Sequence, residues 1–291
     1  MSTAEVTRAG QAAGPVDPVI HWIRFLRSEL SLIFLRWRNL ALLAVLAALP
    51  VLIGIALKLS SPGGGDGRGP AFFAQVTGNG VFLALASLTV LLTLVLPLAV
   101  AVVAGDSVAG EASHGTLRYL LTIPAGRTRL LGIKYTALVI FCLAACAVVT
   151  VAALVTGAAL FPVGPVTLLS GTTISMGAGL LRLALVALYV AAAMAALAAI
   201  GLALSAFTEH PIGAIAAIMV LALASEVSDS VPQFAVVHPY LPTHWWLSFD
   251  ALLRSPIAWP DLSHGLTSFG IYVVIFGAIA WARFAAADVT S

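Results

Sequence analysis

The sequence predicts an all-α integral membrane protein with six transmembrane helices, an N-terminal interfacial amphipathic helix and both termini in the cytoplasm. Of the 291 residues, 61% are hydrophobic and only 9% are charged, and the mean hydropathy is +1.07. A soluble core of this size does not need so much apolar surface, so the solvent of the chain is a bilayer. Several apolar runs approach the roughly 20 residues that a helix needs to cross a membrane. The basic residues are also distributed unequally between the two sides that these runs define.

The N-terminal part is expected to form two different segments before the first span. Residues 1–16 are small and polar and are expected to be a disordered tail. Residues 17–38 predict an amphipathic helix in the inner membrane interface, since apolar side chains recur there every three or four positions while arginines occupy the opposite face. The apolar face consists of Trp22, Ile23, Leu26, Leu30, Ile33, Phe34 and Trp37. Such a helix serves either as an anchor or as a lever that transmits force from a cytoplasmic partner.

Residues 39–291 are expected to form a six-span transmembrane domain. The predicted spans are Asn39–Leu59, Val81–Ala104, Tyr135–Phe161, Leu180–Phe207, Pro211–Val231 and Leu266–Ala286. The fifth span has the weakest pattern, because Glu226 and Asp229 fall in its last turns. Cys142 and Cys146 lie four residues apart within the third span, and we interpret them as buried core residues rather than as a disulfide or metal pair.

The basic residues orient these spans with the N-terminus inside. This orientation places ten basic residues in the cytoplasm, namely Arg8, Arg24, Arg27, Arg36, Arg38, Arg118, Arg127, Arg129, Lys134 and Arg283. It places four outside, namely Lys58, Arg68, Arg182 and Arg254. This excess agrees with the positive-inside rule. The formal net charge of +2 gives no reason to expect a nucleic-acid partner.

The external segments differ in kind. The glycine-rich stretch 60–70 is a low-complexity linker that does not match a phosphate-binding loop. The proline residues Pro162 and Pro165 predict a short second connection. The external loop 226–264 is long and rich in proline and tryptophan, and within it residues 245–253 predict a short helix that enters the outer leaflet.

Charged residues at membrane depth are costly, so they point to candidate functional positions. Arg182, Glu226 and Asp229 are expected near the outer ends of their spans, where they lie simply at the interface or form one polar cluster that acts as an outer gate. No carboxylate is predicted in the middle of a span, and this makes transport driven by an ion gradient a weaker interpretation.

Catalytic motifs are absent from the sequence. It contains no H-E-x-x-H, no G-x-S-x-G and no Walker A lysine, so enzyme activity in this chain alone is not expected. His238 and His244 share the outer loop, and we interpret them as polar loop residues in preference to metal ligands.

The loop 105–134 between the second and third spans is the most informative segment. Asp106 and Glu111 close the second span, and the leucines that follow predict a short helix with one apolar and one charged face before Pro124 and Gly126 end it. A short amphipathic helix at the membrane surface can dock in a groove of a soluble protein. The plainer interpretation is an ordinary basic cytoplasmic loop.

The run from Glu111 to Leu121, which reads Glu-Ala-Ser-His-Gly-Thr-Leu-Arg-Tyr-Leu-Leu and is followed by Pro124, Arg127 and Lys134, resembles the inner-loop signature of type-2 ATP-binding-cassette (ABC) exporter permeases. In that family an acidic residue and a few polar residues precede Gly-Thr-Leu, and leucines, a proline and basic residues then lead into the third span. The six-span layout, the cytoplasmic termini, the interfacial helix and the long last external loop agree with the family over nearly the whole chain. The chain departs from the large lipid-exporting relatives, because it has no attached nucleotide-binding domain and no large external domain.

The resemblance implies a half-transporter in a prokaryotic plasma membrane. Two such permeases, identical or paralogous, would pair, and two separate soluble ABC ATPase subunits would dock beneath them with ATP and Mg, so this chain itself would hold no cofactor. The residues implied in coupling to the ATPase are Glu111, His114, Gly115, Thr116, Leu117, Arg118, Leu121, Pro124 and Arg127. The cargo stays open. Two other interpretations remain, an ATP-independent secondary transporter or channel, and a membrane-embedded enzyme that uses His238, His244 or Glu226.

Overall fold

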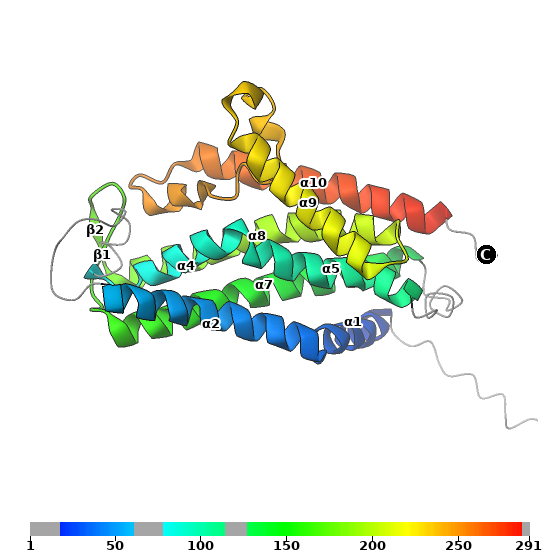
Figure 1. Cartoon of the computed structure of the whole chain (residues 1–291), viewed down its shortest axis with the longest axis horizontal. Coiled ribbons are helices and arrows are strands. Elements are labelled where there is room, and N and C mark those ends of the chain that lie inside the picture. Colours follow the sequence, from blue (N-terminus) through cyan, green and yellow to red (C-terminus); the bar gives the residue numbers. More distant parts are fainter. Residues whose placement is uncertain (1–17, 61–77, 114–126, 287–291) are drawn as a thin grey trace, which may run out of the picture.

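The computed structural model describes residues 18–60, 78–113 and 127–286 of the chain. Within these ranges the chain is predominantly helical, and most helices run along the long axis of an elongated bundle (Figure 1). The helices are α1 (Pro18–Phe34), α2 (Trp37–Ser60), α4 (Phe82–Thr93), α5 (Val95–Ser113), α7 (Arg127–Leu160), α8 (Met176–Ala206), α9 (Pro211–Asp229) and α10 (Trp259–Ala286). The predicted N-terminal tail and nearly all of the linker 60–70 lie outside the described residues.

Five of the described helices are long and apolar enough to cross a membrane, and α4 together with α5 makes a sixth if the pair is one broken span. The second predicted span is therefore not the single helix that the sequence suggested, because its two parts meet at an angle of 54° around Leu94. Pro97 lies in the first turn of α5 and has no N–H to donate to the carbonyl of Thr93. The missing donor explains why one continuous helix does not form there.

Several predicted boundaries shift, and the starts of α7 and α10 shift because hydropathy does not detect the polar residues at the beginning of a helix. Helix α7 already begins at Arg127, ahead of the apolar run that starts at Tyr135. Helix α10 begins at Trp259 rather than at Leu266. The predicted interfacial helix 17–38 is α1 up to Phe34, and a short elbow then leads into α2 at Trp37.

Helix α8 forms the centre of the bundle and packs against α5, α7 and α10. In its most apolar stretch 72% of the residues are buried, against 17% in the corresponding stretches of α2 and α10. Small side chains between Ala191 and Ala199 let neighbouring helices approach α8 closely. Cys142 and Cys146 are buried and unpaired in this core, as predicted. The outer helices expose many large apolar side chains, which suits a hydrocarbon environment.

Short irregular elements connect α7 to α8 and α9 to α10. A two-residue β-hairpin pairs β1 (Val166–Thr167) with β2 (Thr173–Ile174), and Gly171 adopts a positive φ of 79° in its turn. The connection between α7 and α8 is thus a hairpin and not merely a short loop. Three 3₁₀-helices, η2 (Pro232–Phe234), η3 (His238–Tyr240) and η4 (Ser248–Leu253), follow α9. The predicted helix at 245–253 is η4 in its second half, and Trp246, Phe249 and Leu252 are buried.

Candidate functional site

We call the end of the bundle where α5 ends at Ser113 and α7 begins at Arg127 the loop end. The elbow between α1 and α2 and the C-terminal end of α10 lie at this same end (Figure 1). The connecting residues 114–126 lie outside the described residues. This gap contains seven of the residues predicted to couple to an ATPase, namely His114, Gly115, Thr116, Leu117, Arg118, Leu121 and Pro124. Arg127 starts α7, and its side chain is likewise not described, whereas Glu111 and Lys134 are described on either side of the segment.

Lys134 joins three helices at the loop end. Its Nζ donates to Oε1 of Glu111 on α5 at 2.6 Å and to Oε1 of Glu29 on α1 at 3.1 Å. The lysine side chain is only 2% exposed, while Glu29 and Glu111 are 15% and 19% exposed. A buried ammonium is tolerated because carboxylates compensate its charge, and charge-assisted hydrogen bonds of this kind are the stronger ones.

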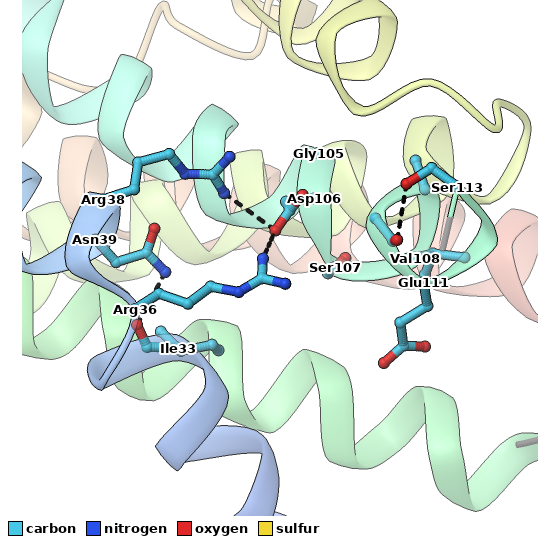
Figure 2. A network of polar contacts seen from close by, with 12 residues as sticks. Ile33, Arg36, Arg38, Asn39, Gly105, Asp106, Ser107, Val108, Glu111 and Ser113 are labelled. Carbon is cyan, nitrogen blue, oxygen red and sulfur yellow. Dashed lines mark hydrogen bonds and ion pairs between the residues drawn. The ribbon is translucent and has the colours of Figure 1, made fainter. Parts of the chain in front are cut away.

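A second set of ion pairs fixes the elbow between α1 and α2 against α5. Figure 2 shows Arg36 and Arg38 converging on the carboxylate of Asp106. The Arg36 guanidinium bonds directly to Oδ2, and Nη2 of Arg38 lies 3.0 Å from the same oxygen. Asn39 donates from Nδ2 to the carbonyl of Ile33 at 2.9 Å, which satisfies one of the carbonyls left open at the end of α1.

We call Glu29, Arg36, Arg38, Asp106, Glu111 and Lys134 together the polar junction. Its cations and carboxylates balance in number, so the cluster needs no further ion for neutrality. The junction connects α1, α2, α5 and α7, and its members on α5 and α7 lie between three and eight residues from the segment 114–126. Hydrogen-bonded ion pairs need N···O distances within about 4 Å, so a displacement of α5 and α7 at this end either carries α1 along or breaks the pairs.

Ser205 ties α8 to the turn of α5 that carries Asp106. Its Oγ accepts from the N–H groups of Val108 at 3.2 Å and Ala109 at 2.9 Å, and it donates to the carbonyl of Gly105 at 2.8 Å. Gly105 and Ala109 are an i, i+4 pair of α5, so the serine hydroxyl sits against the hydrogen-bond ladder of that helix. Side chains at such positions are a known cause of local bending.

Gly105 also lets α9 approach this turn of α5. A Cβ at Gly105 would lie 2.8 Å from Cγ1 of Ile215, closer than carbon atoms normally come. The turn that holds Asp106 is therefore packed against both α8 and α9 as well as paired with the elbow of α1 and α2.

The candidate gate residues at the opposite end have separate partners. Arg182 donates from Nη1 to the carbonyls of Leu252 and Arg254, both at 2.8 Å, and so fastens α8 to η4. Asp229 accepts from His244 at 2.6 Å, and Glu226 is exposed on α9. Among the residues that the structure describes, no ion pair joins Arg182 to either carboxylate. The outer gate therefore stays a prediction.

His238 and His244 do lie together, with ring centroids 6.0 Å apart and Asp229 between them. His238 is the more distant partner, with Nδ1 3.8 Å from Oδ1 of Asp229. Within residues 18–60, 78–113 and 127–286, no group of three or more His, Cys, Asp or Glu side chains is arranged to hold a metal ion. Through their contacts with Asp229, His238 and His244 connect η3 and the following turn to the end of α9.

Sequence reasoning singled out Glu111 but missed Glu29 and Ser205. Glu29 carried a signal, since it is an acidic residue in a helix whose other charged residues beyond Asp17 are arginines. Lys134 carried another, because it is one of only two lysines in the chain and directly precedes an apolar span. Nothing local distinguishes Ser205 from the other hydroxyl side chains of the spans.

One family model, described as "Protein of unknown function (DUF2705)", matches residues 69–234, which is more than half of the chain. The matched stretch runs through α4, α5, α7, α8 and α9 and includes Asp106, Glu111 and Lys134. No curated protein matches the chain.

Proposed function

Because the chain belongs to the DUF2705 family of proteins of unknown function, we propose its role from its own loop end: it is the membrane-spanning permease subunit of an ATP-driven ABC exporter. In this proposal it forms the translocation path in a prokaryotic plasma membrane, with both termini in the cytoplasm. ATP hydrolysis belongs to separate ABC ATPase subunits, two per complex, which hold ATP and Mg. A second copy or a paralogue of the permease completes the complex.

Two features of the sequence support this proposal. The run Glu111–Leu121 and the residues that follow it resemble the coupling segment of type-2 ABC permeases. The loop end also carries most of the basic residues near the spans, which favours placing it in the cytoplasm. An ATPase would then meet the segment 114–126 from the cytoplasmic side.

The observation that carries the proposal is the position of Lys134. It bridges α5 and α1 from the beginning of α7, and α5 and α7 are the two helices that the segment 114–126 connects. A force applied to this segment would act on Glu111 and Lys134 together. Through Glu29 it would also act on α1, which makes α1 a lever and not only an anchor.

The proposed cycle follows from these contacts. Closure of the ATPase subunits pushes the coupling segment, and α5, α7 and α1 move as one group because the polar junction joins them. The contacts of Ser205 with α5 pass the movement to the central helix α8. Access to the translocation path then alternates between the two sides of the membrane.

We expect Glu111→Gln and Gly115→Pro to uncouple the reconstituted complex. Glu111→Gln removes a negative charge that compensates the buried Lys134 ammonium, although the amide oxygen can still accept its hydrogen bond. Gly115→Pro disturbs the backbone of the coupling segment. ATP-driven transport and the stimulation of ATPase activity by the permease should both fall by about tenfold or more, the factor that 1.4 kcal/mol represents. Membrane insertion should be unchanged.

The matched control is Glu209→Gln, which neutralises an exposed glutamate in the turn between α8 and α9 at the same end of the bundle. It should leave transport and stimulation as in the unmodified chain. Transport and stimulation that survive both Glu111→Gln and Gly115→Pro would refute the coupling role. Transport in liposomes that needs only an ion gradient would favour the secondary transporter or channel instead.

A further inference from the structure

A cavity of about 280 Å³ lies between α7, α8 and α10 near the loop end. It is separate from the polar junction, because the two share only α7 and no junction residue lines the cavity. Its lining includes Leu131, Gly132 and Tyr135 of α7, Leu202 of α8, and Gly277 and Trp281 of α10. The cavity opens to the surface of the bundle and is almost entirely apolar.

The polar groups on its wall already have partners within the protein. The Trp281 indole donates from Nε1 to Oγ1 of Thr128 at 3.0 Å, and the Tyr135 hydroxyl donates to the carbonyl of Ala195 at 3.3 Å. A buried water needs about two to four polar partners, whereas apolar cavities of about 150 Å³ stay dry and bind a benzene-sized hydrocarbon. A larger cavity of this character therefore suits a hydrocarbon chain better than water.

The position of the cavity determines which hydrocarbon can reach it. The cavity opens between helices whose outer faces expose large apolar side chains, including Val274 and Ile279 of α10. In a bilayer these faces contact acyl chains. An empty cavity there would leave its wall atoms without dispersion partners, so filling it with a chain is favourable.

A cation lies at the loop end of α10, the helix that supplies Gly277 and Trp281 to the cavity. Arg283 follows Trp281 by two residues near the end of α10 and is exposed, with Cζ 5.8 Å from the ring centroid of Phe207. Among the described residues no carboxylate pairs with it. A guanidinium at the level where a span ends suits the phosphate of a lipid headgroup.

We propose that this cavity binds one acyl chain of an anionic phospholipid whose phosphate lies at Arg283. The site is distinct from the coupling segment, so its occupancy does not depend on the ATPase partner. Gly132 and Gly277 line the cavity, and an added Cβ at either position would meet no atom within 4 Å. A larger side chain at either position would therefore occupy the cavity.

The test uses phosphatidylglycerol with a photoreactive diazirine in one acyl chain, mixed at increasing fractions into phosphatidylcholine vesicles that contain the full chain. Labelling followed by peptide mass spectrometry should saturate at about one lipid per chain, with adducts at 128–135 and 273–281. Gly277→Leu and Gly132→Leu fill the cavity from two different helices and should each remove the saturable labelling. Gly270→Leu is the matched control, because Gly270 is an exposed glycine of α10 with equally open space that does not line the cavity.

Arg283→Gln should abolish the preference for the anionic probe over a phosphatidylcholine probe with the same diazirine chain. Thermal unfolding of each variant confirms that it is folded before labelling. Labelling that rises in proportion to the probe without saturating, or that persists in both Gly277→Leu and Gly132→Leu, would overturn the site. Equal labelling of the unmodified chain by both probes would overturn the role of Arg283.

Discussion

Replacing Lys134 with methionine is expected to lower the free energy of unfolding by about 3–5 kcal/mol, the cost of leaving buried charges without their partner. Methionine keeps much of the length of the lysine side chain, so the change removes the ammonium with little loss of volume. Glu29 and Glu111 would then lie against an apolar side chain without the cation that both contact. Thermal unfolding in mild detergent, followed by tryptophan fluorescence, measures the effect.

The other lysine of the chain supplies the control. Lys58 is exposed and donates to the carbonyl of Leu160 at 2.9 Å, so Lys58→Met should cost only about 0.5–1.5 kcal/mol, the value of one ordinary hydrogen bond. The triple variant with Lys134→Met, Glu29→Gln and Glu111→Gln should be more stable than Lys134→Met alone, because it no longer contains the uncompensated carboxylates. Equal losses for Lys134→Met and Lys58→Met would contradict the assigned role of Lys134.

Gly157→Ala is expected to destabilise the bundle by about 1–3 kcal/mol, the range for atoms forced into a packed interior. A Cβ at Gly157 would overlap the backbone carbonyl oxygen of Gly80, and a Cβ at Gly80 would overlap the carbonyl of Gly157 in turn. Gly80 also donates its N–H to the carbonyl of Pro162 at 2.9 Å. The beginning of α4 can therefore move away from α7 only by giving up this hydrogen bond.

Gly132→Ala on the same helix is the matched change. A Cβ at Gly132 meets no atom within 4 Å, so alanine there should be neutral or should stabilise α7 by up to about 1 kcal/mol through its higher helix propensity. The two variants differ only in the space around the added methyl group. A loss of stability in Gly132→Ala as large as that in Gly157→Ala would contradict this explanation. It would show that α7 is sensitive to any substitution and not specifically to the close approach of Gly80.

The positions of the membrane-spanning helices could be predicted because hydropathy is a local property of the sequence. Five of the six apolar runs correspond to single helices long enough to cross a membrane. The break at Leu94 could have been anticipated from Pro97, which lies inside the second run. The polar beginnings of α7 and α10 were missed because residues such as Arg127 and Asp261 interrupt the apolar pattern while remaining helical.

The polar junction was less predictable than the helices. The loop 105–134 attracted attention by its charges, and Glu111 was identified from it. The partner Glu29 lies 105 positions before Lys134, and no local spacing encodes a contact over that distance. The partners of Arg182 were also not predictable, because depth in the membrane does not fix direction around a helix axis. Its guanidinium binds the carbonyls of Leu252 in η4 and of Arg254, the residue after η4.

The most direct test of the proposed function is a mild-detergent purification of the chain from its native membrane, followed by mass spectrometry and an ATPase assay of the eluate. We expect a P-loop ATPase in stoichiometric amount, together with ATPase activity, and both should be lost in the Gly115→Pro variant. An eluate that contains this chain alone and hydrolyses no ATP would contradict the proposed half-transporter.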